Sequence, residues 1–249
     1  MQIRRFFTNK IAENKAVIRG NDYNHIINVL RLKQGDTVNV FNYEHGEFSG
    51  TISAVDALSR EVTVTVSGLV RAVEKNTVKI SAAVAVIKNE NMDLIMEKLT
   101  EIGVDRIIPV ITRRCVVKAD EPEKKAARWQ KIIYSAVKQC GRLTMPELMP
   151  LVRGAEALGK SETRGTRLLL WEKEQEVFLI DEAVKGAAEN SILFFAGPEG
   201  GFEDDEAGAL IVSGFKPVSL GPSTLRAETA VITAAGVISQ AQRRIKWKT

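Results

Sequence analysis

The chain has 249 residues, of which 45% are hydrophobic, so it can bury sizeable cores without disulfide or metal cross-links. Its formal net charge is only +4, and its two cysteines and two histidines lack the spacing of a zinc cluster. That spacing predicts no metal site. No apolar leader and no long apolar run are visible, which predicts a soluble, cytoplasmic protein without a membrane span. Cys115 and Cys140 are predicted to be buried free thiols.

The first seventy residues or so predict a small β-barrel. Asn21–Leu30 has the pattern of a short helix, and Gly35 follows as a turn before a series of short apolar runs. A polar stretch from Arg71 to Thr77 has no periodic pattern and is typical of a domain boundary. The barrel strands are predicted at residues 37–41, 48–52 and 62–66.

From Val78 onward, apolar strand patterns alternate with helix patterns. Such alternation favours an α/β fold in which a largely parallel sheet has helices on both faces. The strands are predicted at residues 79–87, 106–111, 167–171, 192–195 and 217–220, and the helices near residues 91–102, 123–140, 177–188, 204–212 and 228–246.

Charge is distributed unevenly along this second part of the chain. Residues 105–142 contain 10 Lys/Arg against 4 Asp/Glu, whereas residues 172–206 contain 2 against 11. The first segment could follow a phosphate backbone that the second would repel. Solvated helix faces explain both segments equally well, so composition leaves the choice open.

Two loops rich in glycine and proline, residues 197–202 and 220–226, follow two consecutive predicted strands. Loops in this position form a ligand crevice in an open α/β sheet. Neither loop has the lysine of a P-loop or the three-glycine spacing of a dinucleotide loop. Glu199 and the acids at 203–206 occupy the place of an anion, so a neutral or cationic ligand is favoured; they would also cap their helix.

Residues 197–202 and 220–230 together resemble the paired signature of SPOUT-class methyltransferases, which have a deep trefoil knot. In its order of motifs the chain is similar to the ribosomal RNA small subunit methyltransferase E (RsmE) family. That family methylates N3 of a uridine in the decoding region of 16S rRNA. The other matching segments are Arg4–Phe7, His25–Arg31, Glu101–Val104, Arg113–Val117 and Gln139–Arg142.

The resemblance implies a PUA-like β-barrel that binds RNA at residues 1–72 and a SPOUT α/β trefoil-knot domain at residues 73–249. It also implies S-adenosyl-L-methionine (AdoMet) as methyl donor, 16S rRNA in the small ribosomal subunit as substrate, and an obligate homodimer with each site at the subunit interface. The strand pattern by itself predicts an ordinary open sheet, so the knot rests on the resemblance alone.

The resemblance further implies that three loops form the cofactor site. The glycines of these loops would let main-chain groups approach the adenosine of AdoMet. Glu172 and Glu199 are electrostatically compatible with its cationic sulfonium. The implied cofactor residues are Leu170, Glu172, Gly197, Pro198, Glu199, Gly200, Gly201, Leu220, Gly221, Leu225, Arg226, Thr229 and Ala230.

Arg226 is the predicted catalytic residue. Uridine N3 must lose its proton to attack a methyl group, and a fixed guanidinium could stabilise the developing anion or clamp a phosphate. A brace within the knot is the alternative role for Arg226. Neither histidine lies in the loop motifs, so the general base is not identified.

The predicted RNA contacts are basic or polar residues at exposed ends of elements. Gln139 and Arg142 end the long basic helix, where they suit a flipped base or a phosphate. Residues 88–91 depart from the family's pattern, which leaves an RNA contact there open. A non-catalytic RNA-binding or ribosome-assembly module and a related SPOUT methyltransferase for another RNA are the alternative functions. The predicted RNA-binding residues are Arg4, Arg5, Arg31, Arg113, Arg114, Gln139 and Arg142.

Overall fold

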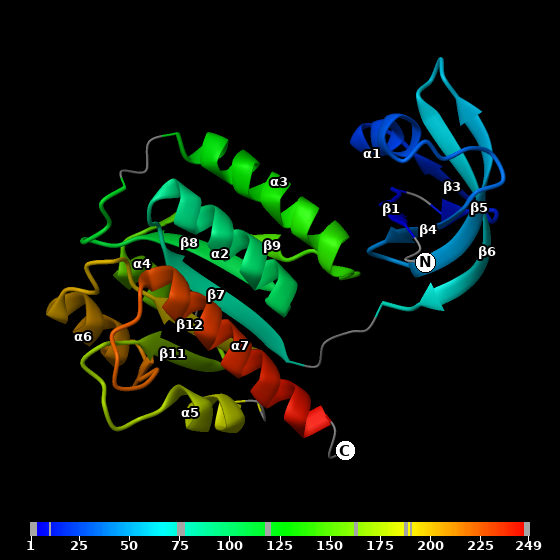
Figure 1. The fold of residues 1–249 in the computed structure, drawn as a ribbon. Coiled ribbons are helices and arrows are strands. Elements are labelled where there is room, and N and C mark those ends of the chain that lie inside the picture. The colour runs from blue at the N-terminus through cyan, green and yellow to red at the C-terminus, as the bar shows by residue number, and fades with distance from the viewer. Residues whose placement is uncertain are drawn as a thin grey trace. The chain divides into compact units, whose positions relative to one another are not determined.

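The computed structural model describes residues 4–9, 11–73, 78–117, 121–161, 164–186, 189 and 191–246 (Figure 1). The chain forms two compact units. Unit 1 comprises Met1–Lys75 together with Val137–Thr144, and unit 2 comprises Asn76–Ala136 together with Met145–Thr249. The functional assignment of residues 1–72 and 73–249 stays a prediction, and residues 74–77 of the predicted boundary lie outside the described residues.

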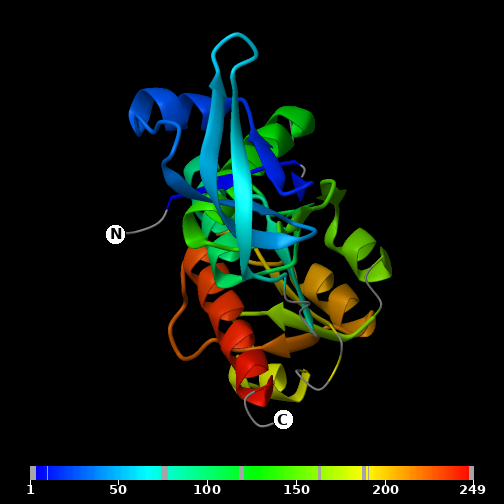
Figure 2. The same cartoon turned by 90° about the vertical axis from the view of Figure 1, so that its right-hand side faces the viewer.

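Unit 1 is built on a six-stranded sheet in the order β1-β4-β5-β6-β3-β2, in which only the β1–β4 pair is parallel. The three predicted strands are confirmed, and two of them extend into the long β5–β6 hairpin (Figure 2). The predicted helix is a single α-helical turn followed by a π-helical turn. The elements are β1 (Arg5–Phe7), β2 (Ile11–Ala12), β3 (Lys15–Ile18), α1 (Asn21–Asn24), η1 (His25–Val29), β4 (Thr37–Asn42), β5 (Gly46–Asp56) and β6 (Glu61–Arg71).

The core of unit 1 follows from alternation along these strands. Val62 and Val64 on β6 are fully buried, whereas Thr63 between them is only half-buried, because successive side chains of a strand point to opposite faces. Phe6 is 2% exposed and belongs to the same hydrophobic core as Val62 and Val64, and Phe7 is half-buried.

A buried carboxylate on β5 ties several segments of unit 1 together. Glu47 Oε1 accepts hydrogen bonds from Asn39 Nδ2 at 2.9 Å and Arg5 Nε at 3.4 Å, while Oε2 accepts from Arg71 Nη2 at 2.7 Å. Burial by itself raises the pKa of Glu47. The hydrogen bonds from Asn39 and Arg71, with the positive charges of Arg5 and Arg71, outweigh burial and place this pKa below its ordinary value.

Replacing Glu47 with glutamine is expected to lower the free energy of unfolding of unit 1 by roughly 2 kcal/mol near pH 7, because two arginines lose their carboxylate partner. A carboxyl whose pKa is lowered by folding stabilises the protein at pH values above its ordinary pKa, which is 4.5 for glutamate. This stabilisation is lost as the pH falls through the lowered pKa. The difference between Glu47→Gln and the parent in calorimetric unfolding should therefore shrink below that pH. A difference that stays constant down to pH 3 would contradict the charge-based account.

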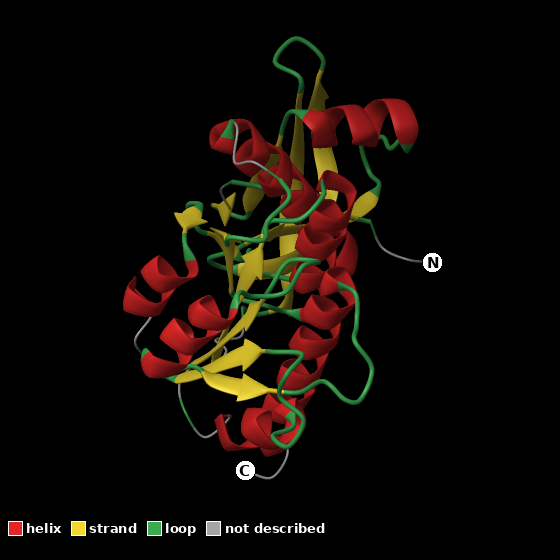
Figure 3. Ribbon diagram, turned by 90° about the vertical axis from the view of Figure 1, so that its left-hand side faces the viewer, coloured by secondary structure: helices red, strands yellow, loops and turns green. Residues whose placement is uncertain are grey.

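Unit 2 contains a parallel sheet in the order β10-β8-β7-β12-β11-β13, with β9 paired to β8. Helices lie on both sides of its strands (Figure 3), as the alternating pattern predicts. On one side α7 packs between α2 and α5, and α4 packs against α6. The strands are β7 (Lys79–Ala85), β8 (Arg106–Ile111), β9 (Glu147–Leu148), β10 (Val152–Arg153), β11 (Thr166–Leu170), β12 (Ser191–Ala196) and β13 (Lys216–Val218).

The helices of this part of the chain begin and end close to their predicted bounds, except that α4 is not predicted. Residues 187 and 188, the last two of one predicted helix, lie outside the described residues. None of the described helices is long and apolar enough to span a membrane. The helices are α2 (Asn89–Ile102), α3 (Pro122–Cys140), α4 (Ala155–Ser161), α5 (Leu179–Gly186), α6 (Asp204–Val212) and α7 (Ala227–Lys246).

The prediction of buried thiols is wrong. Cys115 is half-buried in the loop after β8, and Cys140 is exposed at the end of α3. Helical periodicity continues the apolar face of α3 to Cys140, but the last turn of a helix need not be covered by the core that covers its middle.

The trefoil knot implied by the resemblance stays a prediction.

Candidate functional site

The carboxyl ends of β7, β12, β11 and β13 meet at one edge of the parallel sheet, and the segments that follow them surround a cavity of about 1100 Å³. This position is where ligands bind in open α/β sheets. Thr229, exposed on the first turn of α7, does not line the cavity, but every other predicted cofactor residue does. These residues are Leu170, Glu172, Gly197, Pro198, Glu199, Gly200, Gly201, Leu220, Gly221, Leu225, Arg226 and Ala230.

Sequence reasoning missed a further part of the lining. Lys88 and Asn91 contribute from the start of α2, and Trp171 and Phe178 contribute from the segment between β11 and α5. A signal for the first pair is present in the sequence: residues 88–91 follow the predicted first strand of this domain, and the carboxyl ends of parallel strands share one edge. These four residues are among the added candidates for ligand contact.

Glycines of the first loop are required by the packing of the protein itself. A Cβ added to Gly197 would lie 2.9 Å from Cε2 of Phe202, and one added to Gly200 would lie 3.2 Å from Cβ of Arg114. Gly201 has φ +69°, and its Cβ would lie 2.7 Å from Glu172 Oε1. The sequence interpretation explains these glycines by ligand approach; the structure adds the close contact with the Phe202 ring at Gly197 and the positive φ at Gly201 as reasons for glycine.

Phe202 anchors this loop in the core. Its ring is 1% exposed and lies edge-to-face against Phe195 of β12, with ring centroids 5.0 Å apart and an interplanar angle of 71°. Glu206 Oε2 then accepts a hydrogen bond from the Glu203 amide at 3.3 Å, as in a capping box at the start of α6. The acids that follow the loop therefore do cap their helix.

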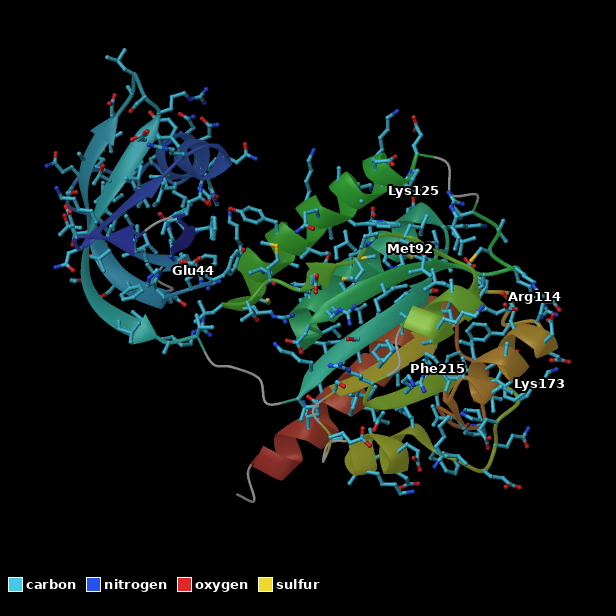
Figure 4. All side chains as sticks on the ribbon, turned by 180° about the vertical axis from the view of Figure 1, so that it is seen from behind. Glu44, Met92, Arg114, Lys125, Lys173 and Phe215 are labelled. Carbon is cyan, nitrogen blue, oxygen red and sulfur yellow. The ribbon has the colours of Figure 1, made fainter. Side chains whose placement is uncertain are left out.

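Arg113 and Arg114, in the loop after β8, are paired with these acids. Arg114 lies beside α6 (Figure 4). Its Nε and Nη2 donate to the two carboxylate oxygens of Glu203, at 2.9 Å each. Its Nη1 donates to the Gly200 carbonyl at 2.8 Å. Arg113 pairs with Asp205 through its guanidinium. The hydrogen bonds between Arg114 and Glu203 raise the pKa of the arginine and lower that of the glutamate.

Carboxylates outnumber cations in the cavity lining. Glu172, Glu174, Glu199 and Glu228 line it, against the cations Lys88 and Arg226. This excess of negative charge favours a cationic ligand over a polyphosphate.

Arg226 is exposed where the second loop enters α7. Its backbone carbonyl accepts from the Ala230 amide at 2.8 Å, as expected for the first turn of that helix. Among the described residues, no hydrogen bond or ion pair of its guanidinium is found. Arg226 also lines the cavity.

The predicted RNA contacts of unit 1 have different surroundings. Arg4, Arg31 and Gln139 are exposed. The Arg5 side chain is only 14% exposed, and its guanidinium donates to the carbonyls of Val137, Lys138 and Arg142, so it caps the end of α3. Arg142 is half-buried and donates from Nε to Thr144 Oγ1 at 3.0 Å. The structure thus gives Arg5 a role within the fold, which charge and position in the sequence do not indicate.

A smaller cavity of about 330 Å³ lies beside the first turns of α3. Its walls are mostly apolar and include Trp129, Met149 and Leu151, with Glu123 and Arg153 among its few charged residues. It contains none of the predicted site residues.

Comparisons with known protein families match both parts of the chain. The family described as RNA methyltransferase domain matches residues 74–239, and the family described as RNA methyltransferase PUA domain matches residues 18–64. A ribosomal RNA small subunit methyltransferase E from Rickettsia conorii is 32% identical over 240 residues, which cover 94% of each chain. The Bacillus subtilis protein of the same name is 28% identical over 228 residues, covering 89% of this chain and 88% of its own.

Solved structures of similar proteins have the same fold as this chain. The Legionella pneumophila protein Lpg2936, solved in complex with the cofactor SAM, superposes with a TM-score of 0.85 and is 32% identical, covering 97% of this chain and 98% of its own. A ribosomal RNA small subunit methyltransferase E from Neisseria gonorrhoeae, bound to S-adenosyl methionine, has a TM-score of 0.81 and 25% identity, covering 96% and 98%. The predicted fold class, a PUA-like unit followed by a methyltransferase domain with a parallel sheet, is confirmed.

Proposed function

Because the chain belongs to the ribosomal RNA small subunit methyltransferase E family, we propose that it methylates N3 of a uridine in the decoding region of 16S rRNA. The observation that carries this proposal is the cavity at the carboxyl edge of the parallel sheet. It gathers all but one of the residues assigned to the cofactor, from three loops far apart in the sequence.

The lining of this cavity fits AdoMet as the methyl donor. Bound AdoMet would supply an electrophilic methyl group on a positively charged sulfonium. The excess of carboxylates over cations suits such a charge, and the volume of about 1100 Å³ admits a nucleoside-sized ligand. The related Legionella and Neisseria proteins crystallised with SAM support the same choice.

We assign the chemistry to Arg226. N3 of uridine becomes a good nucleophile only as its proton leaves, and negative charge then develops on the two uracil oxygens. An exposed guanidinium at the cavity would stabilise this charge and hold the base in line with the methyl group. The proton leaves to water or to one of the carboxylates of the lining.

We further propose that RNA contacts unit 1 through Arg4, Arg31, Gln139 and Arg142, and that the protein acts as a homodimer. The exposure of Arg4, Arg31 and Gln139 supports a phosphate or base contact. Arg5 is left out of this proposal because its guanidinium caps α3.

The test is a nucleoside analysis of 16S rRNA from strains with and without the gene. N3-methyluridine should be absent from the decoding region in the deletion strain, and expression of the parent chain should restore it. Expression of the Arg226→Ala chain serves as the matched control and should not restore it. If the modification persists in the deletion strain, the proposed function is wrong.

A further inference from the structure

One peptide unit of the cavity wall, the peptide that joins Gly200 to Gly201, is held at both of its polar atoms. The Gly201 amide donates to the Pro198 carbonyl at 2.9 Å, which closes a turn within the loop. The Gly200 carbonyl accepts from Nη1 of Arg114 at 2.8 Å. All three loop residues line the cavity, whereas Arg114 belongs to the loop after β8 and does not line it.

This peptide would be easy to rotate without the two hydrogen bonds. Two successive glycines have no Cβ to restrict φ and ψ, so the peptide between them can rotate more freely than a peptide between other residues. Gly201 already occupies a left-handed conformation, with φ +69°. The conformation of this part of the cavity wall therefore depends on what holds the peptide.

Arg114 is itself held in place from outside the cavity. Its guanidinium makes a bidentate pair with Glu203, at 2.9 Å for each hydrogen bond, and Glu203 is fixed at the start of α6. Its aliphatic stem packs against Gly200, where an added Cβ would lie 3.2 Å from the Cβ of Arg114. A planar fork with five donors can serve the carboxylate and the carbonyl together, which a lysine ammonium cannot do with the same geometry.

We propose that Arg114 is a positioning residue for the cofactor site: it holds the Gly200–Gly201 peptide in the orientation that binds AdoMet. The inference rests on the proposed function and replaces the predicted RNA contact of Arg114. It assigns Arg114, in the loop after β8, to the methyl-donor site, although Arg114 lies 86 residues before Gly200 in the sequence.

Titration calorimetry with AdoMet is the first test. Arg114→Ala should raise the Kd for AdoMet about 10-fold, and Arg114→Lys about threefold, because lysine retains charge but not the bidentate contact. In steady-state methylation the KM for AdoMet should rise with it, while kcat at saturating AdoMet stays within about threefold of the parent value. Arg128→Ala is the matched control, since Arg128 makes a two-point pair with Asp93 on α2, outside the cavity; its Kd should stay within about twofold.

Hydrogen exchange of the ligand-free protein is the second test. The Gly201 amide should exchange faster in Arg114→Ala than in the parent or Arg128→Ala, because the peptide is released on its carbonyl side. If Arg114→Ala leaves both the exchange rate and the AdoMet Kd unchanged, the proposal is overturned. A loss of RNA affinity with unchanged AdoMet affinity would also overturn it, in favour of a phosphate contact. If the parent chain fails to bind AdoMet, the proposed function fails, and the exchange experiment still decides whether Arg114 holds the peptide.

Discussion

Replacing Arg226 with alanine should lower kcat for RNA methylation by about 100-fold or more, while the Kd for AdoMet changes less than about threefold. The expectation follows from the position of the side chain. It is exposed at the junction of the second glycine loop and α7, and among the described residues its guanidinium has no protein partner. Its removal should therefore cost little stability and act mainly on the developing negative charge of the uracil ring. Steady-state methylation of small subunits from a deletion strain measures kcat, and calorimetry measures the Kd for AdoMet.

Two further variants make this result interpretable. Arg226→Lys should recover part of kcat, because an ammonium keeps the positive charge but cannot contact two oxygens in a planar fork. Arg19→Ala removes an exposed arginine of unit 1 that pairs with Glu61 and is the charge control, with kcat expected to equal the parent value. An Arg226→Ala protein with unchanged kcat would leave Arg226 only a structural role at the start of α7.

The second large effect is expected in the core beneath the first glycine loop. Phe202→Ala should lower the free energy of unfolding of unit 2 by about 3–5 kcal/mol, because it opens a cavity next to Phe195. AdoMet binding should be lost at concentrations that saturate the parent chain, since Phe202 also fixes the loop through its contact with Gly197. Urea unfolding followed by tryptophan fluorescence measures the stability of unit 2, because the two tryptophans that the structure describes, Trp129 and Trp171, belong to it.

Phe202→Leu is the matched variant for this experiment. It keeps most of the buried volume and should lower the free energy of unfolding by no more than about 1.5 kcal/mol. It should also retain measurable AdoMet binding. If Phe202→Ala unfolds at the same urea concentration as the parent, or binds AdoMet as tightly, the loop is not anchored through this ring.

The parallel sheet and most of its helices could be predicted from local pattern. Apart from Lys79 and Ser81, residues 79–87 are apolar, and in the structure Ile80 to Ala85 are all buried, as expected for a strand covered on both faces. The short strands β1, β2 and β3, of two to four residues, could not be predicted from local pattern. They are too short to show a period, and pairing with distant strands is what makes them strands.

The sequence by itself determined the edge of the sheet at which the cavity lies, because the loops that follow parallel strands must share one edge. The lining includes twelve of the thirteen assigned cofactor residues. Only the tertiary structure decided the partners of the charged residues. Arg114 pairs with Glu203, and Arg5 contacts the end of α3, across separations of 89 residues and more than 130 residues. A charge pattern shows that a side chain can bind an anion or a carbonyl, but folding brings such a partner within hydrogen-bonding distance.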